Sequence, residues 1–129
     1  MFEPYQRHPA LYSLHGVFLD DSSVLRVVVI YREVRIMLLA VLLSSHPQFE
    51  APPKNQVWCY KRAELFFGDV ASVSWTGQDM TSATTVDETG EEDIGTIDGV
   101  EYENETFRLR GDFGVIEIES SAPIFRLLE

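Results

Sequence analysis

Lysine and arginine are missing from a long central stretch of this chain. No basic residue occurs in residues 63–107, whereas the rest of the sequence mixes both signs. The same stretch contains an acidic segment, residues 87–105, which holds nine aspartates and glutamates. This asymmetry predicts a concentrated negative potential on one face or loop, and such a potential attracts cationic partners.

Cysteine is nearly absent as well. Cys59 is the only one, so no intramolecular disulfide can form. Its neighbours Val57, Trp58 and Tyr60 are typical of a strand, and we expect a buried, reduced thiol. The alternative is a catalytic thiolate, which would need a nearby cation such as Lys61 to lower its pKa.

Long apolar runs and clustered basic residues are both lacking. The longest uncharged apolar run, residues 36–43, is too short to span a bilayer. Residues 1–10 do not have the pattern of a signal peptide, so we expect a cytoplasmic protein. The ten basic residues are scattered and the net charge is -11. This argues against nucleic-acid binding and against binding to an anionic membrane surface.

The chain has enough apolar material for one core. With 129 residues, of which 45% are apolar, it suits a single β-rich domain covering residues 1–129. Residues 77–93 are polar and acidic, and we expect them to form an acidic loop within that domain.

Strand patterns dominate the sequence. Residues 24–30 are rich in β-branched side chains, and residues 34–43 are apolar on both faces, which suits either a central strand or a buried helix. We favour the strand, because a helix there would have almost no polar face. The strands are expected at residues 13–19, 24–30, 34–43, 57–67, 70–76, 94–103, 106–110, 115–119 and 124–128.

Turn residues separate these strands. Residues 20–23 are expected to form a turn after the first strand, and Gly68 with Asp69 a hairpin between residues 57–67 and 70–76. The fold class is therefore all-β, or β-rich α+β. Its expected architecture is an antiparallel sandwich or open barrel of about 7–9 strands.

The last hairpin also predicts ion pairs. Phe107, Leu109, Ile116 and Ile118 alternate with charged residues and are expected to point inward. Their charged neighbours should pair across the hairpin: Arg108 and Arg110 with Glu117 and Glu119.

Motifs for catalysis or cofactor binding are not found. His8, His15 and His46 lack the spacing of a metal pair, although a site formed by His15 with Asp20 stays an alternative. The acidic segment does not keep the register of an EF-hand loop, and the serines lack a glycine-flanked elbow. We therefore expect no cofactor, no metal and no catalytic residue.

The order of several segments resembles a known group of proteins. The segments are residues 14–16, 24–30, 63–70 and 107–118, in which apolar alternation is punctuated by glycines. They resemble small uncharacterised bacterial β domains, among them immunity proteins of polymorphic toxin systems. The resemblance implies binding without catalysis.

Three functional hypotheses follow. The first is a non-catalytic binding protein, in its narrower form an immunity-type inhibitor, whose acidic face binds a basic protein. Its expected partner-binding residues are Asp87, Glu88, Glu91, Glu92, Asp93, Asp98, Glu101 and Glu103. The second is a small-ligand binder or enzyme with a pocket lined by Trp58, Trp75 and Tyr102. The third is a structural homo-oligomer in which residues 34–43 form the interface.

Overall fold

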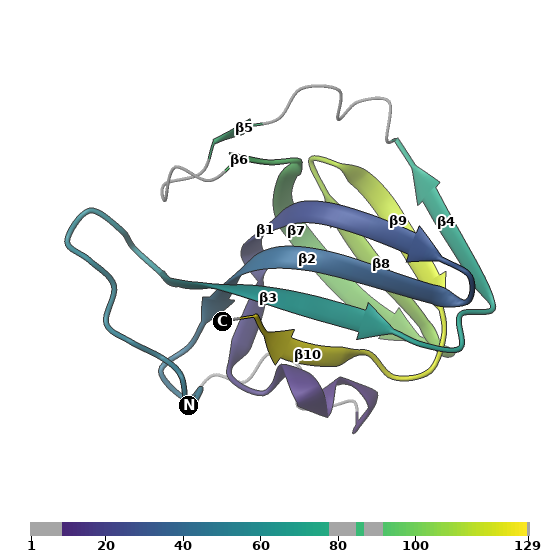
Figure 1. Cartoon of the computed structure of the whole chain (residues 1–129), viewed down its shortest axis with the longest axis horizontal. Coiled ribbons are helices and arrows are strands. Elements are labelled where there is room, and N and C mark those ends of the chain that lie inside the picture. The colour runs from purple at the N-terminus through teal and green to yellow at the C-terminus, as the bar shows by residue number, and fades with distance from the viewer. Residues whose placement is uncertain (1–8, 78–84, 87–91, 129) are drawn as a thin grey trace.

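The computed structural model describes residues 9–77, 85–86 and 92–128, which are mostly β-strand. Figure 1 shows the arrangement of these elements. In chain order they are η1 (Pro9–Leu14), β1 (Val17–Ile30), β2 (Glu33–Leu42), β3 (Cys59–Phe67), β4 (Ser72–Thr76), β5 (Thr85–Val86), β6 (Glu92–Asp93), β7 (Gly95–Glu103), β8 (Thr106–Gly111), β9 (Gly114–Glu119) and β10 (Ile124–Leu127). The one helix in the described residues, η1, is a short 3-10 helix, and none there is long and apolar enough to cross a membrane.

Eight of the strands form one open antiparallel sheet. Their order is β10-β3-β2-β1-β7-β8-β9-β4, so β10 and β4 are its two edges. The short strands β5 and β6 pair only with each other in this arrangement. The expected all-β fold is confirmed, and the sheet remains unclosed.

The sheet is bent so that its two halves face each other. Figure 1 shows the half made of β10, β3, β2 and β1 in front of the half made of β7, β8, β9 and β4. Phe67 on β3 and Phe107 on β8 are far apart in strand order, yet their ring centroids are 5.0 Å apart. Trp75 on β4 adds a hydrogen bond of 2.8 Å from its indole nitrogen to the carbonyl oxygen of Phe113. The core therefore lies between the two halves.

β2 is the most buried strand. It pairs with β1 along one edge and with β3 along the other. Val34, Ile36 and Leu38 point into the core, while Leu39 and Val41, on the opposite face, are buried too. Residues 34–43 are thus a strand and not a helix. Both edges of β2 are paired within the chain, so it offers no free edge to a second copy, and the oligomer hypothesis stays a prediction.

The acidic turn expected at residues 20–23 is a bulge inside β1. The pairing of β1 with β2 shifts between Phe18 and Ser23, and Asp21 has a left-handed φ of 75°. Ser22 bridges the gap: its hydroxyl donates to the carbonyl oxygen of Phe18 at 2.8 Å and accepts from the amide of Val41 at 2.9 Å. Because this side chain replaces the missing ladder bonds, the strand continues after the bulge.

The hairpin predicted at Gly68 and Asp69 does not form. Both edges of β3 are occupied, by β2 and by β10, so β4 has no place beside it. Instead the chain crosses to the other half of the sheet, where β4 pairs with β9. The amide of Val70 donates to the carbonyl of Arg32 at 3.1 Å on the way, and that of Ala71 to the carbonyl of Glu119 at 2.8 Å.

β7, β8 and β9 form a meander with tight turns. Asn104 and Glu105 both have left-handed φ values, of 53° and 62°, as a two-residue hairpin turn requires. A register shift places Asp98 as a bulge in β7. These turns fix which residues of the three strands lie side by side.

Candidate binding surface

The outer face of β7, β8 and β9 is built by strict alternation. Phe107, Leu109, Ile116 and Ile118 are fully buried in the core, as the sequence predicts. The residues between them must point away from the core. Apart from Val115, the side chains of β8 and β9 on this outer face are charged or carry a hydroxyl group.

One row across this face is electrically paired. Glu101, Arg108 and Glu117 are directly opposite one another on β7, β8 and β9. The guanidinium of Arg108 lies 3.7 Å from the carboxylate of Glu101 and 3.5 Å from that of Glu117. The predicted Arg108–Glu117 pair is confirmed, and the row carries one cation between two anions.

The neighbouring row also has a glutamate on each outer strand, but it has no cation between them. Glu103, Thr106 and Glu119 are opposite one another, so a threonine occupies the position that Arg108 fills in the first row. The hydroxyl of Ser72 on β4 donates to the carboxylate of Glu119 at 3.4 Å. Within the described residues neither glutamate forms an ion pair. This row, Glu103–Thr106–Glu119, is called the uncompensated row below.

Arg110 has a different role from the predicted one. It lies opposite Val115, out of register with Glu119, because the turn pairs Gly111 with Gly114. Its guanidinium is instead 3.9 Å from the carboxylate of Glu101. The predicted pair of Arg110 with Glu119 is wrong because the register of this hairpin forbids it.

The two bulges bring acids near Arg110. Burial raises the pKa of the Asp20 carboxyl above its ordinary value, and the adjacent Asp21 carboxylate adds to the rise. Arg110 opposes this effect, and Asp98 contributes weakly to it. Asp20 lies on β1 and not on β7, β8 or β9, so we do not count it as part of the candidate binding surface.

The structure places part of the predicted acidic site on this face. Glu101 and Glu103 are exposed on β7, and Asp98 is exposed at its bulge. Glu92 and Asp93 form β6. Asp87, Glu88 and Glu91 lie outside the described residues.

Two residues of this surface were not among the predicted site residues. Glu117 and Glu119 were expected only as ion-pair partners, yet they lie beside the β7 acids across β8. The alternation of residues 115–119 together with the register of the hairpin is the signal that identifies them. We call Glu101, Glu103, Glu117 and Glu119, with the residues between them, the acidic outer face.

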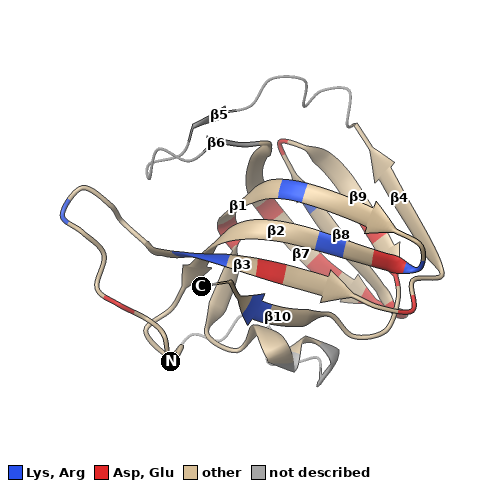
Figure 2. Cartoon of the chain, viewed as in Figure 1, with Lys and Arg blue, Asp and Glu red and all other residues tan. Residues whose placement is uncertain are grey.

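The other half of the sheet holds most of the basic residues that lie on strands, mixed with acidic ones. Figure 2 shows basic residues on β1, β2, β3 and β10. Four of these basic residues lie on the outer face of their strands: Arg26, Arg35, Arg62 and Arg126. Asp20, Asp21, Glu33 and Glu64 lie on the same strands, so the excess of basic residues is small. We call this half the basic half, and the half with β7, β8 and β9 the acidic half.

A buried carboxylate organises this basic half. Glu64 on β3 is only 3% exposed and accepts a hydrogen bond of 2.6 Å from Arg126 on β10. Its second oxygen lies 3.6 Å from the guanidinium of Arg35 on β2. The guanidinium of Arg35 also lies over the ring of Phe66, at 5.4 Å from its centroid. Three strands are therefore tied together by one charge.

The histidines and the cysteine are placed structurally. His46 accepts a hydrogen bond of 3.0 Å from the amide of Gln48 through Nδ1, and burial followed by the charge of His15 lowers its pKa. Cys59 is buried, as expected, and accepts a long hydrogen bond from the amide of Glu50. Among the described residues, no three His, Cys, Asp or Glu side chains are grouped to hold a metal ion.

The aromatic residues expected to line a pocket have separate neighbours. The ring of Trp58 packs on Phe18 with centroids 5.9 Å apart, and Trp75 bonds to Phe113. Tyr102 lines two shallow hollows, one of them on the acidic outer face together with Glu103 and Thr106. The structure does not bring the three together in one described pocket.

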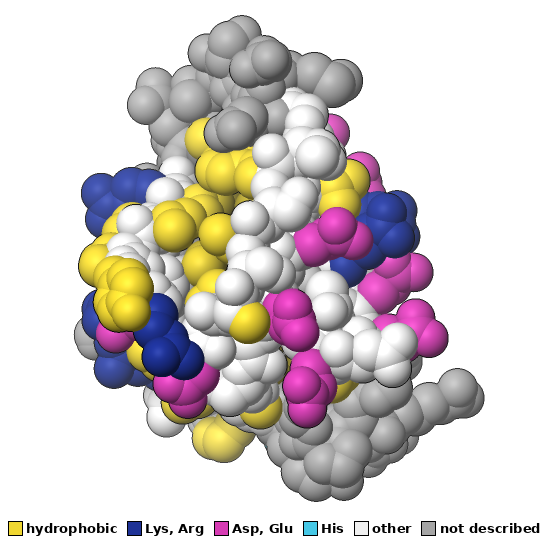
Figure 3. Space-filling model, turned by 90° about the vertical axis from the view of Figure 1, so that its right-hand side faces the viewer, with side chains coloured by type: hydrophobic (Ala, Val, Ile, Leu, Met, Phe, Trp, Pro, Cys, Tyr) yellow, Lys and Arg dark blue, Asp and Glu magenta, His cyan; other side chains and the backbone are white. Residues whose placement is uncertain are grey.

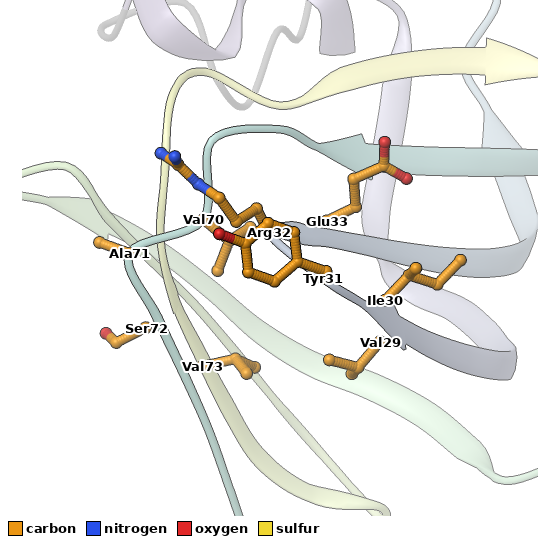
Figure 4. Close-up of a pocket in the computed structure, with 9 residues that line it drawn as sticks. All are labelled: Val29, Ile30, Tyr31, Arg32, Glu33, Val70, Ala71, Ser72 and Val73. Atoms are coloured by element: carbon orange, nitrogen blue, oxygen red, sulfur yellow. The ribbon is translucent and has the colours of Figure 1, made fainter.

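A shallow hollow of mixed lining, with Arg32 and Glu33 beside several apolar residues, opens between the β1–β2 hairpin and β4. Its volume is about 600 Å³, and Val29, Tyr31 and Val73 are among its lining residues (Figure 4). Tyr31 at the hairpin tip is 87% exposed. Figure 3 shows apolar side chains on this side of the molecule, with acidic ones beyond them. The hollow is therefore flanked by the acidic half of the sheet.

Comparisons with known proteins returned nothing: no family model, curated protein or solved structure is significantly similar to this chain. Its function must therefore be argued from its own surface.

Proposed function

We propose that this protein is a non-catalytic binding protein whose acidic outer face receives a basic protein partner. The observation that carries the proposal is the uncompensated row. Glu103 and Glu119 flank a threonine on β8, whereas the adjacent row has Arg108 in the equivalent position. A lysine or arginine of a partner completes the second row as Arg108 completes the first.

The geometry of the sheet favours this contact. Alternate strands of a sheet lie about 10 Å apart, so a cationic group placed over β8 reaches carboxylates on both neighbours. Arg108 does this within the protein, at 3.7 Å and 3.5 Å. The face is rigid because it is formed by paired strands, and a preformed face loses little entropy on binding.

The wider charge distribution adds long-range attraction. The net charge of -11 steers a cationic protein toward this molecule, and the acidic half presents the favourable side. An immunity-type inhibitor that covers the basic site of a toxin is the narrower form of this proposal. Its support is the sequence resemblance together with a face suited to a basic surface.

Affinity capture followed by titration tests the proposal. The immobilised protein is exposed to lysate of the source cell, and a retained basic protein is identified and purified. Its Kd is then measured at several salt concentrations against two variants with equal charge changes. The test variant carries Glu103→Gln and Glu119→Gln, and the control carries Glu33→Gln and Glu50→Gln, which lie away from the acidic outer face.

The two variants separate a local contact from a general charge effect. We expect the test variant to raise Kd by about tenfold, a loss of about 1.4 kcal/mol in binding free energy, because two carboxylates that face the partner's cation are neutralised. The Kd of the test variant should also depend less on salt concentration than that of the wild type. The control variant should change the Kd by less than about threefold. Equal effects of the two variants, or none, would overturn the proposal.

A further inference from the structure

The two edges of the open sheet differ in how they are protected. At β10, the hydroxyl of Ser13 in the segment of η1 donates to the carbonyl of Pro123 at 2.9 Å and accepts from the amide of Phe125 at 3.2 Å. β10 also contains Arg126 and follows a proline, both of which discourage pairing with another strand. This edge is capped.

The β4 edge has none of these devices. Its sequence, Ser72 to Thr76, contains no charge and no proline, and it pairs with β9 along one side only. Among the described residues no backbone group bonds to its other side. Uncharged edges of this kind accept an additional strand.

The register shows which groups are presented. The amide of Ser120 bonds to the carbonyl of Glu105 on the β8 side, so the alternate residues of β9, among them Glu117 and Glu119, direct their backbone toward β4. Their partners are Ser74 and Ser72. The N–H and C=O groups of the intervening residues of β4, Val73 and Trp75, therefore point to the open edge.

The two faces of β4 specify what an added strand must carry. On the outer face, Ser72 and Ser74 lie next to Glu119 and Glu117. Serine side chains are short, so a long cationic side chain on the added strand can lie across them and reach the carboxylates. On the inner face, Val73 borders the hollow, which Val29 also lines, and an apolar side chain is favoured beside these two valines.

We propose that the open edge of β4 binds an extended segment of the partner in which cationic and apolar residues alternate. The inference rests on the proposed function and makes it more specific, because the basic partner then docks through an added β-strand. A second copy of this chain is a poorer occupant. Pairing two β4 edges would place two acidic outer faces side by side, in a chain with a net charge of -11.

Peptide binding to the full chain tests the inference. The probe is a short, fluorescently labelled peptide of alternating lysine and valine. A peptide of the same composition, with the lysines and valines in separate blocks, controls for charge. The blocking variant is Val73→Pro, which removes an N–H from the open edge without touching a bond to β9. Its matched control, Val73→Thr, keeps the N–H and the branched shape.

The expected result is selective loss. The wild type should bind the alternating peptide at least about fivefold more tightly than the peptide with separate lysine and valine blocks. The Val73→Pro substitution should raise the Kd of the alternating peptide by about tenfold. Val73→Thr should change the Kd by less than about threefold. If Val73→Pro does not fold, amide exchange in the wild type gives the answer, because peptide binding must slow exchange at Val73 and Trp75.

Three results would overturn the inference. Equal binding of both peptides with no effect of Val73→Pro would refute strand addition, and it leaves the proposed function standing if Glu103→Gln with Glu119→Gln still weakens the basic partner. No peptide binding would also refute strand addition, with the partner titration again deciding the proposed function. A dimer in sedimentation that Val73→Pro abolishes would assign the edge to a second copy.

Discussion

Replacing Glu64 by glutamine removes the charge that holds Arg35 and Arg126 together on the basic half of the sheet. The side chain keeps its size, so packing is little changed. The hydrogen bond of 2.6 Å from Arg126 becomes an uncharged one, and the attraction of Arg35 at 3.6 Å is lost. Both arginines are then left beside a neutral group.

The size of the effect follows from exposure. Breaking a fully buried ion pair by removing one partner costs about 3–5 kcal/mol, because the remaining charge stays buried. Here the side chains of Arg35 and Arg126 are 38% and 60% exposed, so water can solvate them after the change. We expect a loss of about 1–3 kcal/mol in the free energy of unfolding, and a fall in Tm of about 4–12 °C.

Urea unfolding followed by circular dichroism measures this loss. Arg126→Gln is the comparison, because it removes the hydrogen bond of 2.6 Å and leaves the buried carboxylate of Glu64 with only Arg35 at 3.6 Å. A buried carboxylate is solvated less well than an exposed guanidinium, so Arg126→Gln should cost at least as much as Glu64→Gln. A Glu64→Gln protein as stable as the wild type would show that this carboxylate does not tie the three strands together.

Three further changes test the local structure. Gly114→Ala should lower the free energy of unfolding by about 2–4 kcal/mol, because Gly114 has a φ of 107° and an added Cβ would press on the carbonyl oxygen of Thr76; unchanged urea unfolding would contradict the turn geometry. Asp20→Asn should stabilise the protein at neutral pH. Burial raises the pKa of Asp20 above its ordinary value of 3.8, so the ionised carboxylate of the wild type lowers the free energy of unfolding at neutral pH. In urea unfolding at several pH values, the gain from Asp20→Asn should vanish as the pH is lowered. The pKa of His46 is lowered below 6.5, so its contribution to stability is complete above that pH and is lost as the pH falls. His46→Asn should therefore lose less stability than the wild type as the pH falls below 6.5, and parallel curves would refute this.

Local pattern was enough to predict most strands. The alternation around Phe107 and Ile116 gave the correct inward faces of β8 and β9. The doubly apolar residues 34–43 gave the central strand β2. In these segments burial and β-propensity favour the same structure, so the local sequence pattern is sufficient to predict a strand.

Long-range pairing could not be predicted in the same way. Gly68 and Asp69 have the composition of a hairpin turn, but the place beside β3 is taken by β10, which comes almost sixty residues later in the chain. The residues from Asp20 to Ser23 also have the composition of a turn. Whether they end β1 or bulge out of it depends on Ser22 reaching Val41 on another strand.

The acidic site was predicted in part because one signal was visible and the other was not. The charge run drew attention to Glu101 and Glu103, which are exposed on β7. Glu117 and Glu119 lie outside that run, and only strand order places them on the same face. The contrast between Arg108 and Thr106, on which the proposal depends, requires the register of all three strands.

The most direct test of the account is to supply the missing cation from within the protein. Thr106→Arg places a guanidinium between Glu103 and Glu119, as Arg108 lies between the glutamates of the adjacent row. The measurement is the Kd of an oligolysine peptide for this variant and for the wild type, at low salt. We expect a folded variant with a Tm near that of the wild type and a Kd raised about tenfold or more. A stable Thr106→Arg protein that binds oligolysine as tightly as the wild type would contradict the claim that the uncompensated row receives a partner's cation.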